Sequence, residues 1–259
     1  MSDLPSIEMQ DVRVVHPRNP GVTLIEEVGW VVRPGEFWVV AGLQGSGKTV
    51  LLETAAGLTP QGGGSVRLFG EEVQGGQRDE GEASGVRRRL GLLFDGNGRL
   101  FPSLNVFENI ALPWCYHRNA SLADAAEALA PLLEYLQLDR LLDQRPGRLG
   151  RAWARRVALG RALATGPELL LLDNPLSGLD MAHIRWWRTF LSDASRGHAA
   201  LGGRPLTLIA ASEELRPLLV PGRRFALAHN GRWRVLGSTE DVLSARGDDG
   251  VRELLGDND

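Results

Sequence analysis

Residues 42–49, GLQGSGKT, constrain the fold of this chain more than any other segment. They fit the pattern G-x-x-x-x-G-K-[ST], follow the apolar run FWVVA and precede TVLLETAAG, which is typical of a helix. A strand, a glycine-rich turn and a helix in this order predict a loop whose backbone N–H groups converge on an anion. The segment therefore predicts an α/β fold with this loop at the carboxyl end of a buried strand.

The residue types in this loop suit a phosphate ligand. Glycines let backbone N–H groups approach phosphate oxygens, Lys48 brings a positive charge to the β and γ phosphates, and the Thr49 hydroxyl is a ligand for Mg²⁺. Asp173, which ends an apolar run, is placed to hold the same metal from a neighbouring strand. The sequence thus predicts a bound nucleoside triphosphate with Mg²⁺. The residues predicted to contact it are Gly42, Leu43, Gln44, Gly45, Ser46, Gly47, Lys48, Thr49 and Val50.

Short apolar runs bounded by glycine, proline or charged residues predict buried strands. Longer alanine-rich and leucine-rich patterns predict helices, and their alternation with the strands predicts a mainly parallel sheet covered by helices. The predicted strands are 37–42, 90–94, 169–173 and 206–211, and the predicted helices are 120–138 and 154–166.

Two polar regions flank these elements. The glycine-rich segment 71–85 predicts an exposed loop of a peripheral β region. The tail from Arg223 onward predicts a small hairpin followed by one helix. We expect this tail to be an appendage and not a second domain.

Composition excludes several classes of function. With 259 residues, 43% of them apolar, the chain can bury one large core, and a net charge of −3 gives no general attraction to nucleic acid. The single Cys115 cannot form an internal disulfide, and the first ten residues lack the pattern of a secretory signal. The longest apolar runs fall short of the about 20 residues that span a bilayer. We therefore expect a cytoplasmic protein that binds no nucleic acid and meets a membrane only through a partner.

The order of these segments resembles the ATP-binding cassette (ABC) family over nearly the whole chain. The resemblance implies a P-loop NTPase with a RecA-like α/β core, an antiparallel β subdomain and an inserted α-helical subdomain. Residues 1–259 would form one nucleotide-binding domain, with the core and β subdomain at 1–94 and 156–222, the helical subdomain at 95–155 and the appendage at 223–259. The segments that carry the resemblance are GLQGSGKT, LGLLF before Asp95, RVALGRAL, LLLLDNPLSGLD, LTLIAAS and NGRWRVLGSTEDVL.

This resemblance implies the ATP-binding subunit of a transporter, peripheral on the inner face of the cell membrane. It would bind ATP and Mg²⁺, dock on a transmembrane permease and pair with a second cassette, either itself or a paralogue. Each nucleotide would lie between one chain's P-loop and the other's signature. The segment at 92–113 looks most like the ATPases of bacterial MCE-type phospholipid transporters, although it also fits an ordinary coupling-surface helix. The D-loop would be Ser177, Gly178, Leu179 and Asp180.

Three reactive positions depart from the family pattern in a way that weakens hydrolysis. Asn174 stands where the family has the glutamate that polarises the attacking water, and an amide cannot accept a proton. Glu213 stands at the switch histidine, where its carboxylate would repel the γ phosphate unless it is neutralised. Asp95 stands at the Q-loop glutamine. It is shorter and charged, so it can still meet Mg²⁺ but has a different reach to the water.

The signature and the adenine contact also depart from the pattern. Without the serine and glycines of LSGGQ, Arg151 would either obstruct the partner's γ phosphate or bring a charge to it. His16 aligns with the aromatic residue that stacks on adenine, and it either stacks more weakly or has no ligand. The signature LSGGQ aligns with Leu149, Gly150, Arg151, Ala152 and Trp153.

These departures lead to three hypotheses. The first is an ATP-binding cassette with weak or lost hydrolysis, whose nucleotide-driven dimerisation regulates or scaffolds a membrane transporter. The second is a fully active transport ATPase with a compensated site, in which Asp95 or a partner residue replaces the lost base. The third is a soluble non-transport cassette serving translation or DNA repair. Such relatives usually carry two cassettes or a long coiled coil, and this sequence shows neither.

Overall fold

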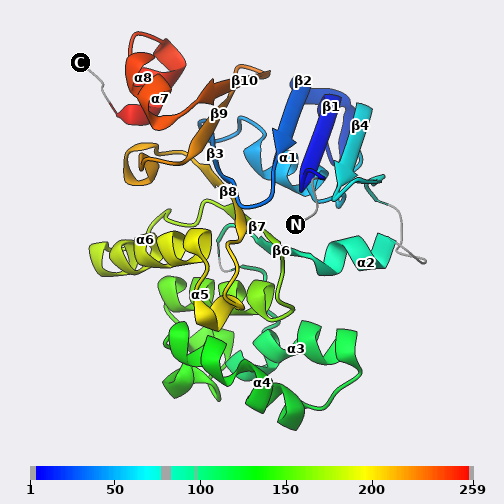
Figure 1. Cartoon of the computed structure of the whole chain (residues 1–259), viewed down its shortest axis with the longest axis vertical. Coiled ribbons are helices and arrows are strands. Elements are labelled where there is room, and N and C mark those ends of the chain that lie inside the picture. The colour runs from blue at the N-terminus through cyan, green and yellow to red at the C-terminus, as the bar shows by residue number, and fades with distance from the viewer. Residues whose placement is uncertain (1–3, 77–82, 97, 257–259) are drawn as a thin grey trace. The chain divides into compact units, whose positions relative to one another are not determined.

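A computed structural model describes residues 4–76, 83–96 and 98–256 (Figure 1). These residues form two compact units, one made from the chain up to Arg87 and from Thr207 onward, the other from Arg88 to Leu206. No helix among the described residues is long and apolar enough to cross a bilayer.

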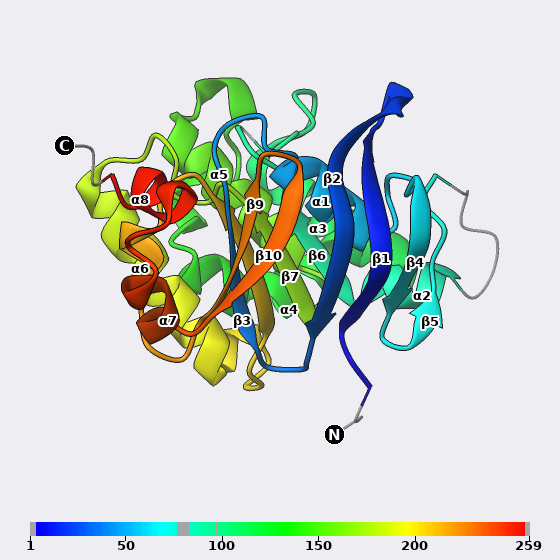
Figure 2. The ribbon, with the colours of Figure 1, turned by 90° about the horizontal axis from the view of Figure 1, so that it is seen from above.

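The first unit is built on eight strands in the order β5-β4-β1-β2-β10-β9-β3-β8. β1 pairs antiparallel with β2 and β4, and Figure 2 shows these three strands side by side. β3 instead runs parallel to β8 and β9. The strands are β1 (Ile7–His16), β2 (Asn19–Val32), β3 (Phe37–Ala41), β4 (Gly63–Leu68), β5 (Glu71–Glu72), β8 (Thr207–Ser212), β9 (Arg224–His229) and β10 (Arg232–Gly237).

Strand burial explains this arrangement. Every residue of β3 and β8 is buried, as expected for parallel strands that are covered on both faces. The helix α1 (Lys48–Ala55) follows β3 and buries Leu51 and Leu52. Both predicted strands are thus confirmed.

The C-terminal tail forms the predicted hairpin, β9 with β10, but two helices follow it where one was predicted. β9 lies between β10 and β3, with Phe225 paired to Val39, because its residues 225–228 are all buried and fit a central strand. Two helices follow it, α7 (Thr239–Ser244) and α8 (Asp249–Leu255), each started by a side-chain cap. The tail is therefore an integral part of the first unit.

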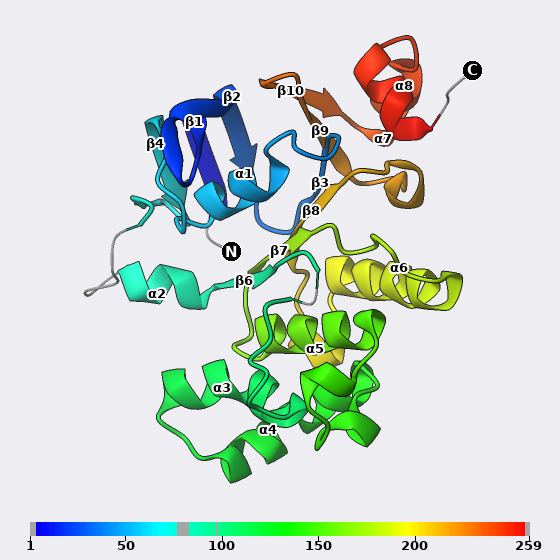
Figure 3. The same ribbon diagram turned by 180° about the vertical axis from the view of Figure 1, so that it is seen from behind.

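The second unit pairs two parallel strands, β6 (Leu90–Leu93) and β7 (Leu169–Asp173), with Leu93 opposite Leu172. Figure 3 shows α3 and α4 close to α5. The amino ends of β6 and β7 are joined by an ion pair between Arg89 and Glu168, at 2.6 Å between Nε and Oε1. The helices are α3 (Val106–Arg118), α4 (Leu122–Tyr135), α5 (Arg151–Leu163) and α6 (Met181–Arg196).

Helix bounds differ from the sequence prediction at three places. α5 begins at Arg151, because Gly150 already serves as its N-cap, so the expected subdomain boundary at 155 falls inside a continuous helix. The helix expected at 120–138 ends at Tyr135. The segment 71–85, expected to be an exposed loop, begins with β5 and ends in α2 (Ala83–Arg88). Its residues 77–82 lie outside the described residues, as does Asn97 of the expected helical subdomain.

Candidate functional site: a phosphate loop and a cluster at two strand ends

The predicted phosphate loop joins β3 to α1, and steric contacts explain its glycines. Gly42 N donates to Ser212 O at 3.2 Å, and a Cβ on Gly42 would come within 2.4 Å of the Ala228 oxygen. Gly45 and Gly47 have φ of 80° and 91°, a left-handed region that glycine adopts without strain. The backbone of this loop therefore depends on glycine at positions 42, 45 and 47.

Lys48 folds back over the same loop. Its Nζ donates to Leu43 O at 2.7 Å and to Ser46 Oγ at 3.4 Å, and the side chain is only 4% exposed. Lys48 is also the only lysine of the sequence. α1 begins at this residue after a glycine, which has no side chain to occupy the first N–H groups. The Lys48 ammonium and the N-terminal end of the α1 dipole together favour an anion.

Glu213, at the expected switch position, lies at the same sheet edge as the loop. β8 runs parallel to β3 with Ser212 opposite Ala41, so both strands end together. Glu213 follows Ser212 directly and is partly exposed. The structure thus places a carboxylate, where the family has an imidazole, next to a loop suited to anions.

His16 ends β1 at an exposed hairpin, where its Nδ1 accepts from Arg18 N at 3.2 Å. Two residues back, Val14 pairs with Ile25, whose side chain would lie within 3.1 Å of a Cβ on Gly47. At about 3.3 Å per residue, His16 is roughly 7 Å along the strand from that contact. His16 therefore lies at the turn of the β1–β2 hairpin, two residues beyond the pair that contacts the phosphate loop.

In the second unit, Asp173 and Asn174 follow one another at the carboxyl end of β7. Asp173 is 2% exposed and Asn174 is 7% exposed. Asn174 has a φ of 47°, a left-handed conformation that asparagine adopts more readily than most side chains. Asp95 follows the parallel strand β6, and its Oδ2 accepts from Asn174 Nδ2 at 3.3 Å. Two of the predicted reactive residues are therefore in direct contact.

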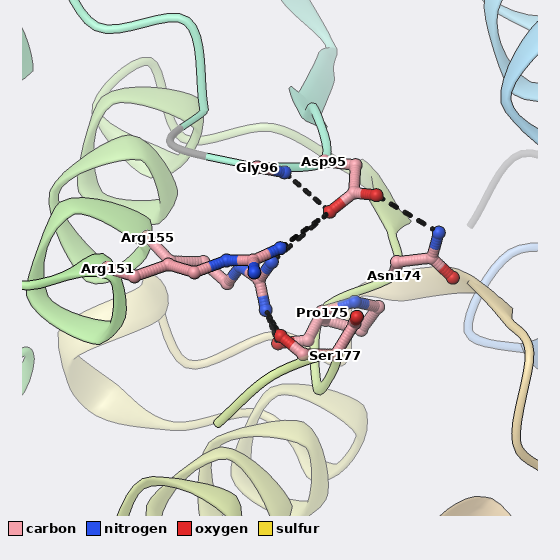
Figure 4. Close-up of polar contacts among 7 residues, drawn as sticks. All are labelled: Asp95, Gly96, Arg151, Arg155, Asn174, Pro175 and Ser177. Atoms are coloured by element: carbon pink, nitrogen blue, oxygen red, sulfur yellow. Dashed lines mark hydrogen bonds and ion pairs between the residues drawn. The ribbon is translucent and has the colours of Figure 1, made fainter. Parts of the chain in front are cut away.

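Arg155 binds this pair from α5, as Figure 4 shows. Its Nη2 donates to Asp95 Oδ1 at 3.2 Å, and its Nη1 donates to the carbonyl oxygens of Ser177 at 2.7 Å and Pro175 at 3.2 Å. The Arg155 side chain is fully buried. Burial lowers the pKa of Arg155, while the Asp95 carboxylate acts to raise it. We call Asp95, Asn174 and Arg155 the strand-end cluster.

Sequence reasoning did not identify Arg155. The signal was present, because Arg155 lies among residues 154–160, all of which are buried in α5. A charged residue on such a face needs a partner of opposite charge. Nothing in the sequence showed that this partner is Asp95, which is 60 positions away.

Arg151, in the signature-like segment, faces its own chain. Its Nη2 lies 3.9 Å from Asp95 Oδ1, and a Cβ on Gly178 would come within 3.0 Å of its Nη1. Leu149 and Gly150 precede α5, and a Cβ on Gly150 would meet nothing within 4 Å. Arg151 therefore contacts the expected D-loop and Q-loop positions of the same molecule.

Trp153, the last signature residue, belongs to an aromatic cluster with Arg156 at its centre. The Arg156 guanidinium lies 3.8 Å from the Trp186 ring centroid and 4.6 Å from that of Trp153. It also donates to Gln137 Oε1 at 2.8 Å and to His183 Nδ1 at 3.1 Å. Burial lowers the pKa of Arg156 to about 10. The first two turns of α5 are therefore packed against α6.

The expected D-loop leads into α6. Gly178 has a φ of 66°, and Asp180 caps the helix by accepting from the backbone N–H groups of Ala182 and His183, both at 2.9 Å. These hydrogen bonds, with that from His183 the larger, lower the pKa of Asp180. Ser177 contributes its carbonyl to Arg155, as described above.

The available donors fit Mg²⁺ with a nucleotide. The Thr49 hydroxyl in the first unit and the Asp173 carboxylate in the second are oxygen donors, which Mg²⁺ prefers. Mg²⁺ is commonly bound by one or two carboxylates and completes its shell with phosphate and water. Within the described parts of the chain, no group of three or more histidine, cysteine, aspartate and glutamate residues could hold a metal alone.

Comparisons with known proteins agree on the family. The sequence model described as "ABC transporter" matches residues 25–177. The molybdate/tungstate import ATP-binding protein WtpC of Thermococcus kodakarensis is 32% identical over 90% of this chain and 66% of its own length. The spermidine/putrescine import ATP-binding protein PotA 1 of Pseudomonas aeruginosa is 28% identical over 97% of this chain and 65% of its own. This chain therefore spans just under two thirds of these relatives.

A further relative, the Fe(3+) ions import ATP-binding protein FbpC 3 of Rhodococcus jostii, is 32% identical over 92% of this chain and 64% of its own length. None of these names refers to a phospholipid, so they do not support the expected likeness to phospholipid transporters.

Solved structures show the same fold. The ATP-binding cassette MJ0796, in a dimeric structure bound to ADP and Pi, matches with a TM-score of 0.75 and 22% identity. That match covers 89% of this chain and 98% of the other. These matches show the P-loop NTPase fold expected from the sequence, and the family match agrees with the expected Mg-ATP ligand. Because the family's sequence model covers 153 of 259 residues, the chain belongs to the ABC transporter family.

Proposed function

We propose that this chain is the ATP-binding subunit of an import-type ABC transporter, which binds Mg-ATP but hydrolyses it weakly or not at all. The phosphate loop supports binding, since its glycines, Lys48 and Thr49 fit the pattern and its backbone geometry suits an anion. The relatives support import, since their names are those of import proteins. ATP would bring two cassettes together and so change the state of a permease.

Weak hydrolysis rests on one observation: the Asn174 amide donates to Asp95, and Asp95 is already bound by Arg155. Residue 174 therefore offers no carboxylate to accept a proton from water. The Asp95 carboxylate is a poor substitute base, because its oxygens are already hydrogen-bonded by the Arg155 guanidinium and the Asn174 amide. Glu213 adds a negative charge where the γ phosphate would be held.

The remaining site roles follow from the family pattern. We propose Thr49, Asp173 and Asp95 as the Mg²⁺ ligands and residues 149–153 with 177–180 as the segments that face a second cassette. Residues 95–155 would meet the permease, which would keep the protein at the inner face of the membrane. Copurification with a tagged permease tests the pairing. Recovery of this chain together with a different cassette supports pairing with a paralogue, whereas recovery of this chain as the sole cassette supports pairing with itself. Recovery of no permease in any membrane extract would contradict the transport role.

The class of transported solute is a separate question. The relatives' names refer to oxyanions, polyamines and Fe(3+), whereas the segment at 92–113 suggested a phospholipid. We favour a small polar solute. The purified complex in vesicles should take up such a solute in an ATP-dependent manner without moving a fluorescent phospholipid, and the opposite result would favour lipid transport.

A second candidate is a fully active transport ATPase with a compensated site. It is favoured by the Asp95 carboxylate, whose Oδ2 lies 3.3 Å from the Asn174 amide and is therefore close to the position of the missing glutamate. In that case Lys48→Ala should abolish transport itself and not only assembly. No observation favours a soluble cassette outside transport.

ATP binding is tested by equilibrium titration of the purified chain with a fluorescent ATP analogue and Mg²⁺. We expect saturable binding that Lys48→Ala weakens, and ATP-dependent dimerisation seen by light scattering. Binding that Lys48→Ala leaves unchanged would contradict the assignment of the loop. The sequence has no other lysine that could take its place.

A further inference from the structure

The strand-end cluster connects three segments of the second unit that are far apart in sequence. Arg155 lies on α5, Asp95 follows β6 and Asn174 follows β7. Figure 4 shows Arg155 directed at Asp95 and at the carbonyl groups of the segment after Asn174, with Arg151 beside it. Asp95 Oδ1 accepts from Arg155 and from Gly96 N, while Oδ2 accepts from Asn174. Both oxygens of one carboxylate are therefore engaged.

Arg155 depends on this carboxylate because its charge is removed from water. The side chain has no exposed surface, whereas the Asp95 side chain is 41% exposed. The Pro175 and Ser177 carbonyls satisfy hydrogen bonds but bring no net charge. A buried guanidinium without a carboxylate is costly, so Arg155 favours the arrangement in which the Asp95 side chain is turned toward it.

Asn174 is matched to that charged carboxylate. Its amide is a neutral donor, and its φ of 47° is easier for asparagine than for glutamate. An acidic side chain at 174 would set a second negative charge against Asp95. Two carboxylates at such a distance cannot both ionise freely.

We propose that Arg155 is a positioning residue that holds Asp95 against Asn174, so that residues 95 and 174 act as one coupled pair of a carboxylate and an amide. This inference rests on the proposed weak hydrolysis and deepens it. A glutamate introduced at 174 does not recover hydrolysis while residue 95 is an aspartate. Recovery requires both positions to change together.

The coupling is tested with isosteric exchanges: Asn174→Asp, Asp95→Asn, and the double variant, which again has one carboxylate and one amide. At pH 7 we expect Asn174→Asp to lower the thermal midpoint and the double variant to regain most of the loss. The other charged groups facing the pair are Arg151 and Arg155 from α5 and Asp173 from β7.

A matched control is Asn230→Asp, at an exposed turn with a φ of 50°. Asp-Gly suits such a hairpin turn as well as Asn-Gly, so we expect no change there. The proposal is overturned if Asn174→Asp is as stable as the natural chain, or if the double variant loses the sum of the two single losses.

The role of Arg155 is tested by repeating this cycle in an Arg155→Gln background and, in case that variant does not fold, in an Arg155→Lys background. We expect the coupling between 95 and 174 to disappear with Gln and to persist in part with Lys. If Arg155 only stabilises the fold, the natural pair, both single exchanges and the double exchange at 95 and 174 lose the same stability. The coupling between the two positions is then unchanged, and this result overturns the positioning role.

Hydrolysis gives a third, independent measurement. Asn174→Glu alone should show no more Lys48-dependent turnover than the natural chain, whereas Asp95→Asn with Asn174→Glu should turn over ATP at least ~10-fold faster, or about 1.4 kcal/mol in barrier. Equal rates in the single and double variants overturn the inference. Fast turnover by the natural chain overturns the proposed weak hydrolysis, while the unfolding cycle still decides the coupling.

Discussion

The phosphate loop of the first unit and the strand-end cluster of the second differ in what holds each residue in place. In the loop, a Cβ on Gly42 would overlap a backbone oxygen, so the residue type is dictated by space. In the cluster, Asp95, Asn174 and Arg155 are dictated by one another through charge and hydrogen bonds. A loop fixed by backbone contacts tolerates few substitutions, whereas side chains that bind one another can be substituted if they are substituted together.

The largest effect is expected in the loop. Lys48→Ala removes the ammonium that would meet the β and γ phosphates, and loss of one partner of a desolvated charge pair costs about 2–5 kcal/mol. ATP affinity should therefore fall by ~30-fold to several thousand-fold. Isothermal titration with Mg-ATP measures this. A change below threefold would mean that the nucleotide does not lie on this loop.

Arg155→Met should give the second largest effect. It removes charged hydrogen bonds to Asp95 and to two carbonyl oxygens, a loss of about 2–3 kcal/mol in the free energy of unfolding. Arg151→Met is the matched control on the same helix. Its side chain is 49% exposed and lies 3.9 Å from Asp95, so its loss should stay under about 1 kcal/mol. Urea unfolding of both variants gives the comparison, and equal losses would contradict it.

Gly42→Ala tests the steric account of the loop. The new Cβ would lie 2.4 Å from Ala228 O and 2.5 Å from Ser46 Oγ, and such overpacking costs about 1–3 kcal/mol. Gly150→Ala is the control, since its Cβ meets nothing within 4 Å and its φ is −64°. Thermal unfolding should separate the two. A neutral Gly42→Ala would show that the loop is not fixed by space.

The smallest effect is expected at the opposite ends of β6 and β7. The hydrogen bond from Arg89 lowers the pKa of Glu168 below 4.5, so the ion pair stabilises the fold above that pH and is lost as the pH falls through the lowered pKa. Glu168→Gln should cost under about 1 kcal/mol at pH 7, because Glu168 is 58% exposed, and nothing near pH 2. Unfolding at both pH values tests the sign. Altered ATP affinity in this variant would contradict the separation between scaffold and site.

The sequence predicted the parts of the molecule that depend on local pattern. The loop at 42–49 was recognisable because glycine, lysine and threonine at fixed spacing follow a strand and open a helix. The buried strands β3, β7 and β8 were recognisable as short apolar runs. Each of these signals lies within a few residues of the element that it predicts.

Features that depend on distant contacts were missed. β9 is a central strand because it pairs with β3, which its own sequence does not indicate. Arg155 meets Asp95 across 60 positions, so neither residue alone predicts the pair. The approach of Arg151 to Asp95 is likewise not indicated by the sequence near either residue. Tertiary contacts decided all three cases.

The most direct test of the whole account is steady-state ATP turnover with Mg²⁺, measured on the natural chain and on Lys48→Ala in parallel with binding. The account predicts Lys48-dependent binding with no turnover above the Lys48→Ala background. Lys48-dependent turnover at ordinary enzyme rates of ~1 to 10³ per second would contradict it and would show that the exchange of residues at 95 and 174 still permits hydrolysis.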